Sequence, residues 1–373
     1  MRRGDLVFTC WGTVGQVGLI DERARYDEYV VSNKQMKLTP NPQLADSLFL
    51  YYVFSTPPVS EAIKSQAIGS SVPGFNLGQL RSVRLRLPSI AEQRAIVGVL
   101  GALDDKIEQN RRTAQVLERL AQAMFRAWFV DFEPVKAKAA GANAFPSMPQ
   151  PVFNALATSF VDTDIGPVPE GWKVGAINHL ATLSKTQVDP QEYPEEVVDH
   201  FSIPAFDAGG RPDVEAGSAI KSSKFLVVAG SVLLSKLNPR IARVWLPPLP
   251  CGRRQIASTE FLVFVPVRGS DRHYLYCQFQ QTAFRDDLAQ SASGTSNSHQ
   301  RVRPEDVLGR PLVLPSEPTR EAFAGIGDPL FALIAANDDE SAKLSTIRDY
   351  LLPRLLSGEV RARDAERLIA ASV

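Results

Sequence analysis

Apolar residues recur at helical spacing along residues 90–130. Steps of four and three residues from Ile96 reach Leu100, Leu103, Ile107, Ala114, Leu117, Ala121, Met124 and Trp128. This spacing predicts a long helix with one continuous apolar face. At 1.5 Å per residue, about forty residues would span about 60 Å. The pattern has one exception, because the step between Ile107 and Ala114 falls on Asn110.

A second face of this kind predicts a second long helix over residues 317–358. It passes through Leu330, Ile334, Asn337, Ser341, Leu344, Leu351 and Leu355. A break is expected at Asp328-Pro329, because proline has no backbone N–H and disfavours a helical residue before it. Asn337 holds the place in this face that Asn110 holds in the first. Two interpretations are open: the amides face each other across an antiparallel helix pair, or both face solvent.

Short β-type runs such as "DLVFTCW", "FLVVAGSVLLS" and "EFLVFVPV" alternate with turns and helical stretches outside the long helices. The expected fold is therefore mixed α+β, with two α/β domains separated by two long antiparallel helices that form a coiled coil. An Ala-, Pro- and Lys-rich stretch after the first helix is typical of a linker. The expected order is a partial first domain (1–89), a helix (90–130), a linker (131–164), a second domain (165–316), a helix (317–358) and a tail (359–373).

The chain repeats itself at an offset of about 226 residues. "GDLVFT" at 4–9 matches "GSVLLS" at 230–235, and "LRLPS" at 85–89 matches "LVLPS" at 312–316. "IEQN" at 107–110 matches "IAAN" at 334–337. Each match is short, but their common order and offset predict an internal pseudo-two-fold repeat.

Charge is balanced over the chain, with 41 basic and 41 acidic residues, and unevenly distributed along it. Residues 216–259 contain no Asp or Glu. The basic residues of this window are Lys221, Lys224, Lys236, Arg240, Arg243, Arg253 and Arg254. Two interpretations are open, a solvated surface or a surface that faces phosphate groups.

Catalytic patterns are not found in the sequence. The three cysteines and four histidines stand apart without metal-ligand spacing. "GTVGQVG" at 12–18 lacks a phosphate-loop pattern. "LNPR" at 237–240 lacks the second proline and the aromatic residue of an adenine-methyltransferase motif. No secretory signal or membrane-spanning run is recognised, and the cysteine usage indicates a reducing cytoplasm.

Four stretches together resemble a known family. They are "LPSIAEQRAIVGVLGALDDKIEQNRR", "AQAMFRAWFVDFEPV", "IGPVPEGWKVGAINHLA" and "LLPRLLSGEV". In order and character they are similar to the conserved segments of the DNA-specificity (S) subunit of type I restriction–modification systems. The resemblance covers nearly the whole chain and is weakest in the bodies of the two domains.

The resemblance implies a non-catalytic subunit that binds double-stranded DNA. Two target recognition domains would each read one half of a bipartite sequence, held apart by the paired helices. Modification subunits carrying S-adenosylmethionine would methylate adenine, and restriction subunits would use ATP and Mg²⁺ to translocate and cleave DNA. No cofactor is expected in this chain itself. The alternatives are an adaptor that docks modification subunits but no longer reads a full site, and an autonomous nuclease or methyltransferase.

Side chains able to contact phosphates or base edges lie in the acid-free window and in one later loop. The DNA-binding candidates are Lys236, Asn238, Arg240, Arg243, Arg253, Arg254, Asn297, His299, Gln300 and Arg301. The candidates for the seam between the long helices are Leu103, Ile107, Asn110, Leu117, Leu330, Ile334, Asn337 and Leu344.

The two copies of the repeat differ in what precedes them. "IGPVPEGW" begins 65 residues before Gly230 in the second copy, whereas three residues precede Gly4 in the first. The repeat therefore leads us to expect a first recognition domain shortened at its start by about 62 residues. This expectation motivates the adaptor alternative.

Overall fold

The computed structural model describes residues 1–69, 73–250, 252–292 and 300–372. The chain forms two compact units, of which unit 1 comprises residues 1–113 and 337–373 and unit 2 comprises residues 114–336. Because the chain leaves unit 1, builds unit 2 and returns, each long helix contributes one portion to each unit.

Unit 1 begins with a small antiparallel sheet in the order β2-β1-β3. In β1, Leu6 and Phe8 are buried and alternate with less buried neighbours, as expected for a strand with one covered face. Asp46 caps the following helix by accepting hydrogen bonds from the backbone N–H groups of Leu48 and Phe49. The elements are β1 (Leu6–Thr9), β2 (Val17–Leu19), β3 (Gln35–Leu38), α1 (Ser47–Ser55), α2 (Pro57–Ser65) and α3 (Leu77–Ser82).

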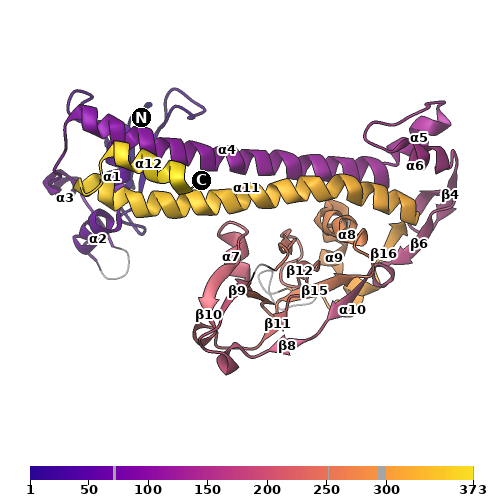
Figure 1. The fold of residues 1–373 in the computed structure, drawn as a ribbon. Helices are drawn as coiled ribbons and strands as arrows, with labels where there is room; N and C mark the ends of the chain where they lie inside the picture. Colours follow the sequence, from indigo (N-terminus) through magenta and orange to yellow (C-terminus); the bar gives the residue numbers. More distant parts are fainter. Residues whose placement is uncertain (70–72, 251, 293–299, 373) are drawn as a thin grey trace. The chain divides into compact units, whose positions relative to one another are not determined.

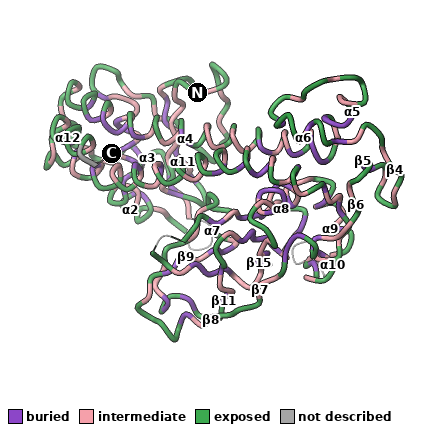
Figure 2. The backbone as a smooth tube through the Cα atoms, turned by 45° about the vertical axis from the view of Figure 1, so that its right-hand side comes forward, coloured by how far each residue is buried: buried purple, intermediate pink, exposed green. Residues whose placement is uncertain are grey.

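Two portions of the long helices complete unit 1. The helices are α4 (Ile90–Phe129) and α11 (Glu317–Ser357), followed by α12 (Ala362–Ser372). Figure 2 shows buried positions alternating with exposed ones along them. In unit 1, α4 contacts α11 through Asp104 with Arg348 and Asn110 with Glu340, so the two portions are antiparallel. The core between them contains Ile96, Leu100, Leu103, Leu344, Leu351 and Leu355, together with Phe49 and Tyr52 of α1 and Ala365 of α12. Figure 1 shows α12 beside α11.

Asn110 is buried in this seam, with 1% of its surface exposed. Its amide nitrogen donates a hydrogen bond of 2.7 Å to Glu340 Oε2, and the Lys106 ammonium lies 3.1 Å from the same oxygen. The amide therefore neither faces solvent nor pairs with the amide of Asn337. Glu340 lies almost one helical turn beyond Asn337. Its long side chain brings the carboxylate to the buried amide of Asn110 while remaining partly exposed to solvent.

Unit 2 contains two larger sheets and two strand pairs. The four-stranded sheet has the order β13-β12-β15-β7, and the five-stranded sheet has the order β10-β9-β14-β11-β8 with β14 and β9 parallel. The pairs are β4 with β5 and β6 with β16. The strands are β4 (Phe160–Thr163), β5 (Gly166–Pro169), β6 (Lys173–Ala176), β7 (Ala181–Ser184), β8 (Gln187–Val188), β9 (Val197–Phe201), β10 (Asp213–Ala216), β11 (Lys224–Leu226), β12 (Val232–Ser235), β13 (Val244–Trp245), β14 (Arg254–Ala257), β15 (Phe261–Pro266) and β16 (Pro311–Leu314).

Aromatic side chains join the helices of unit 2. Phe129 of α4 lies 5.0 Å from Tyr274 and 5.2 Å from Phe323 of α11, measured between ring centres. Phe125 and Trp128 extend the cluster, and all five are buried. The shorter helices are α7 (Ile203–Asp207), α8 (Asp271–Gln280), α9 (Thr282–Ser291) and α10 (Pro304–Leu308), with 3-10 turns at Ile177–His179, Pro190–Glu192 and Gly217–Ala219. The ends of α4 and α11 that belong to unit 2 are therefore part of its core.

Two local expectations differ from the structure. The stretch expected to be a linker contains α5 (Glu133–Ala139) and α6 (Gln150–Ala155), because Val135, Met148 and Phe153 are buried in the core of unit 2. The break expected at Pro329 is also wrong, since α11 continues through it. Burial of Phe323 and Phe331 on either side offsets the hydrogen bond that proline cannot make.

The internal repeat is confirmed in three dimensions. The sheet order β2-β1-β3 of unit 1 recurs as β13-β12-β15 in unit 2. The register also recurs, because Leu6 pairs with Leu38 where Val232 pairs with Phe264. The helix order recurs as well: the first copy has α1, α2, α3 and α4, and the second copy has α8, α9, α10 and α11 in the corresponding places. Residues can therefore be compared between the copies at an offset of 226 or 227.

The Asn110 contact predicts how the seam responds to charge. Asn110→Asp places a buried carboxylate against Glu340, and we expect the free energy of unfolding to fall by on the order of 2 kcal/mol. Gln109→Asp is the matched control, because Gln109 is exposed one residue earlier on α4. Urea unfolding at pH 7 measures both. Equal midpoints for the two variants would show that the Asn110 contact does not stabilise the seam.

His273 couples the packing of unit 2 to pH. Its ring is buried and stacks on Phe331 at 4.6 Å between ring centres. Burial lowers the pKa of His273 to about 4, although Asp328 acts in the opposite direction. The unfolded chain therefore binds a proton below about pH 6.5 that the folded chain does not bind until about pH 4.

We expect the free energy of unfolding to fall as the pH falls through this window. The expected loss is about 1.4 kcal/mol per pH unit, or roughly 2 kcal/mol between pH 6.5 and pH 5. His273→Gln removes the titrating group, so its unfolding free energy should lack this component. Urea unfolding of both proteins at the two pH values tests the expectation, and an identical pH dependence would contradict it.

Candidate nucleic-acid interface

A tight turn after β12 projects basic side chains from the sheet of unit 2. The Ile241 N–H donates a 2.9 Å hydrogen bond to the Asn238 carbonyl. Asn238 has φ = 50°, in the left-handed region that asparagine tolerates better than most residues. Pro239 follows and is buried, whereas Arg240 at the outside of the turn is exposed. The "LNPR" sequence thus acts as a turn.

Backbone hydrogen bonds join this turn to two other segments. The Lys236 N–H donates to the Glu260 carbonyl at 2.8 Å, and the Asn238 N–H donates to the Gln300 carbonyl at 2.9 Å. The Val302 N–H donates to the Lys236 carbonyl at 3.1 Å. We call this arrangement the β12-end surface; its members are Lys236, Asn238, Arg240, Glu260, Gln300 and Arg301.

The charges of the β12-end surface are unevenly paired. Within the described part of the chain, no carboxylate lies within 4.0 Å of the Lys236 or Arg240 side-chain nitrogens. Arg301 instead donates from Nε and Nη2 to the two oxygens of Glu260, each at 3.0 Å. These hydrogen bonds hold the pKa of Glu260 below its ordinary value, although partial burial opposes them. The surface therefore carries three cations and one carboxylate, so it attracts anions.

Other basic candidates are occupied by acids from distant parts of the chain. Arg243 is buried and donates to both oxygens of Asp207, at 2.8 and 2.7 Å. Arg243 is therefore not included in the DNA-binding surface that we propose below. Arg253 donates to Asp199 at 2.6 Å, and Arg254 lies 3.1 Å from Glu196 and over the Tyr193 ring. Lys224 is buried, which lowers its pKa. Asn297 and His299 lie outside the described residues.

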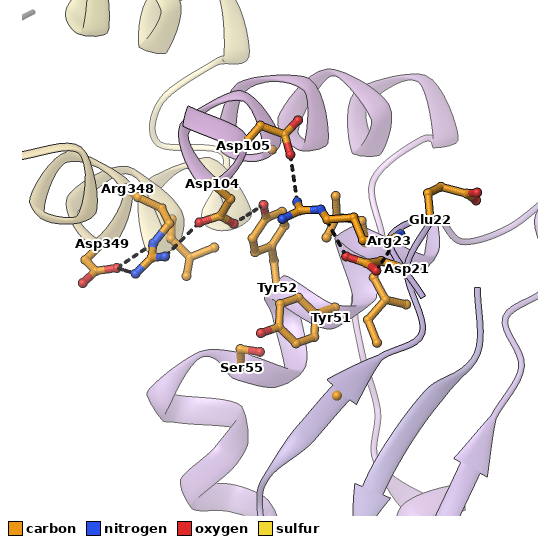
Figure 3. A pocket seen from close by; sticks show the side chains of 15 residues that line it. Asp21, Glu22, Arg23, Tyr51, Tyr52, Ser55, Asp104, Asp105, Arg348 and Asp349 are labelled. Carbon is orange, nitrogen blue, oxygen red and sulfur yellow. Dashed lines mark hydrogen bonds and ion pairs between the residues drawn. The ribbon is translucent and has the colours of Figure 1, made fainter. Parts of the chain in front are cut away.

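A hollow of about 790 Å³ in unit 1 has the opposite charge. Figure 3 shows Asp21, Glu22, Asp104, Asp105 and Asp349 around it, with Arg23 and Arg348. Both arginines are held by these acids: Arg348 donates to Asp104 at 2.8 Å and Arg23 donates to Asp105 at 2.8 Å. Because carboxylates outnumber guanidinium groups, the hollow repels phosphate and is not a DNA-backbone site.

The repeat identifies an equivalent surface in unit 1. The bridge between Leu237 and Arg301 in unit 2 corresponds to the bridge between Trp11 and Gly74 in unit 1. Gly12, with φ = 78°, takes the place of Asn238 and donates to the Pro73 carbonyl. Trp11 has 55% of its surface exposed. Lys34 corresponds to Glu260, since the Cys10 N–H donates to its carbonyl.

Sequence reasoning did not select Glu260, Trp11 or Lys34. Glu260 lies just outside the acid-free window, and its bond to Arg301 joins positions 41 residues apart. Extending the repeat match residue by residue from "GDLVFT" would have pointed to Trp11. Lys34 precedes β3 in a region where the repeat match was too short to align.

The helix seam is divided between the two cores. Leu103, Ile107 and Leu344 belong to the core of unit 1, and Leu330 and Ile334 pack against the core of unit 2. Leu117 is half-buried in unit 2, and Asn337 is half-buried in unit 1 with its carbonyl accepting from the Ser341 hydroxyl.

Two further kinds of site, a metal centre and a membrane span, are not found in the described residues. Among them, no group of three or more His, Cys, Asp or Glu side chains is placed to hold a metal ion. No helix in the described ranges combines the length and the apolarity required to cross a membrane.

Comparison with known proteins gives a consistent result. Residues 2–119 match the family described as the type I restriction modification DNA specificity domain. The type I restriction enzyme MjaIX specificity subunit of Methanocaldococcus jannaschii is 27% identical over 85% of this chain and 70% of its own length. The HindI specificity subunit of Haemophilus influenzae is 26% identical over 90% of this chain and 82% of its own length.

Over most of its length the chain is therefore similar to type I restriction enzyme specificity subunits, and residues 2–119 match their DNA specificity domain. The fold agrees: the crystal structure of the S subunit from M. genitalium has a TM-score of 0.57 and 13% identity, covering 95% of this chain and 83% of that one. The resemblance stated from the sequence is thereby confirmed, as is the mixed fold with two long helices. The relatives are named as specificity subunits, which supports the non-catalytic role that the resemblance implies for this chain.

The structure predicts that Arg243 and Arg240 serve different purposes. Arg243→Ala removes a buried guanidinium and leaves Asp207 unpaired, so we expect the free energy of unfolding to fall by about 1 to 2 kcal/mol. Arg240→Ala removes an exposed side chain, and the change should stay within about 0.5 kcal/mol. Thermal unfolding of the two variants provides the measurement. Similar losses, or a larger loss for Arg240→Ala, would contradict this assignment.

Proposed function

We propose that this specificity subunit binds double-stranded DNA through the β12-end surface and so selects the target of its restriction–modification complex. The observation that carries the proposal is the placement of Lys236 and Arg240, two cations without a carboxylate partner within 4.0 Å in the described chain, beside the fixed Arg301. Phosphate contacts need cations that are not already paired with an acid. An arginine that leaves its carboxylate partner to bind phosphate leaves that carboxylate unpaired, which costs free energy.

The construction of the surface supports a role in recognition. Exposed turns on a rigid sheet are common positions for binding residues. Here the turn is held by hydrogen bonds to two other segments, and Arg285 donates to the Arg240 carbonyl at 3.0 Å. Cations that position the DNA backbone lie beside groups that can contact base edges, namely Gln300 and Arg301.

The partners follow from the family. We propose that modification subunits bind this chain and supply S-adenosylmethionine for adenine methylation at a bipartite target. Restriction subunits would join them and supply the sites for ATP and Mg²⁺ used in translocation and cleavage. The complex would act in the cytoplasm. In this proposal the chain contributes selection of the DNA sequence and docking of the other subunits.

Binding of the full chain to duplex DNA tests the proposal. We expect affinity to fall steeply with salt, and Arg240→Ala to reduce the slope of log affinity against log salt by about one. Arg253→Ala is the matched control, because Arg253 pairs with Asp199 away from the β12-end surface. We also expect no cleavage or methylation by the chain alone. Absence of DNA binding at low salt, or equal slopes for wild type and Arg240→Ala, would contradict the proposal.

A further inference from the structure

The pair formed by Arg301 and Glu260 has a geometry suited to one particular base. We infer that Arg301 reads a guanine in the major groove and that Glu260 is its positioning residue. This inference rests on the proposed function, since it assigns a base contact within the DNA-binding surface. It also assigns a role to a carboxylate on a surface that otherwise attracts anions.

The two hydrogen bonds occupy one side of the guanidinium and leave its end open. Glu260 accepts from Nε and from Nη2 of Arg301, each at 3.0 Å. A guanidinium has five N–H groups, so both N–H groups of Nη1 and one of Nη2 remain. The outer edge formed by Nη1 and Nη2 presents two parallel donors. Guanine offers two matching acceptors, O6 and N7, in the major groove.

Glu260 lowers the entropic cost of this contact. An exposed arginine samples many rotamers and loses them when it binds. Here the side chain of Arg301 is 50% exposed, yet its head group is fixed by a carboxylate that is 29% exposed. Both residues are also held through the backbone, Glu260 by its carbonyl to Lys236 and Arg301 by its bridge to Leu237. The donor edge is therefore oriented before DNA arrives.

Stability alone does not explain the pair. Ion pairs between exposed side chains typically contribute about 1 kcal/mol or less to folding, and bidentate geometry such as this one makes that contribution more favourable. The pair also carries no net charge, so it contributes little to the attraction of phosphate. Lys236 and Arg240 supply that attraction from the same surface. A neutral, oriented donor pair on the same surface as these two cations instead meets the requirement for discrimination among bases.

The first copy of the repeat cannot make this contact. Gly74 corresponds to Arg301 and Lys34 corresponds to Glu260, judged from the equivalent backbone bonds. At this place unit 1 presents Trp11 and Lys34 in place of an arginine held by an acid. The guanine contact is therefore specific to the half of the target that unit 2 reads.

A selection from a pool of random-sequence duplex DNA tests the inference with the full chain. We expect wild type to enrich sequences with guanine at one fixed position. Arg301→Ala should lose that preference by about 5- to 100-fold while keeping the other positions. Arg301→Lys keeps the charge but not the fork, and should lose the preference as well. Arg303→Ala, at an exposed arginine two residues further on, is the control and should leave every base preference unchanged.

Glu260→Gln provides the second arm, because it has nearly the same shape and keeps one acceptor oxygen. We expect it to weaken the same guanine preference without lowering the salt slope, even if Arg301→Ala should fail to fold. Retention of the guanine preference in Arg301→Ala or in Glu260→Gln would overturn the inference. So would a uniform loss at all positions with a lower salt slope, which is the signature of a phosphate contact. If wild type enriched no sequence, the proposed function itself would fail.

Discussion

Burial of the apolar faces of α4 and α11 is the constraint on which both units depend. Each helix gives one portion to each core, with Leu100 and Leu351 buried in unit 1 and Trp128 and Phe323 buried in unit 2. The core of unit 1 therefore cannot form from one continuous stretch of chain, and the core of unit 2 joins the two ends of the continuous stretch 114–336. This accounts for the tolerance of Pro329 inside α11, since the packing on either side compensates for one missing hydrogen bond.

The distribution of free positive charge follows from pairing between distant residues. Asp207, Asp199 and Glu196 lie outside the acid-free window and neutralise Arg243, Arg253 and Arg254 within it. Among the residues that the structure describes, the cations of this window without a carboxylate within 4.0 Å include Lys236 and Arg240, which lie where β12 ends. A basic window in a sequence therefore shows where positive side chains lie along the chain. The fold decides which of them are paired with acids and which stay unpaired at the surface.

Regular patterns predicted the fold well because they report local physics. The spacing from Ile96 to Trp128 reflects helix geometry. The two copies of the sequence repeat have the same sheet order and register in the structure. The partner of Asn110 could not be predicted in this way, because the register between α4 and α11 decides that Glu340 reaches it. The linker prediction was wrong because it relied on the Ala, Pro and Lys content of the stretch and gave too little weight to Val135, Met148 and Phe153, which are buried. At the candidate site, Arg240 and Arg301 were selected, whereas Glu260 required knowledge of a contact across 41 residues.

Ultraviolet crosslinking of the full chain to duplex DNA, with the attached peptides identified by mass spectrometry, tests the central claim most directly. The claim is that DNA lies against the β12-end surface. The account predicts crosslinks within residues 236–241 and 300–303. Crosslinks confined to the acidic hollow, at residues 101–105 or 348–352, would contradict it.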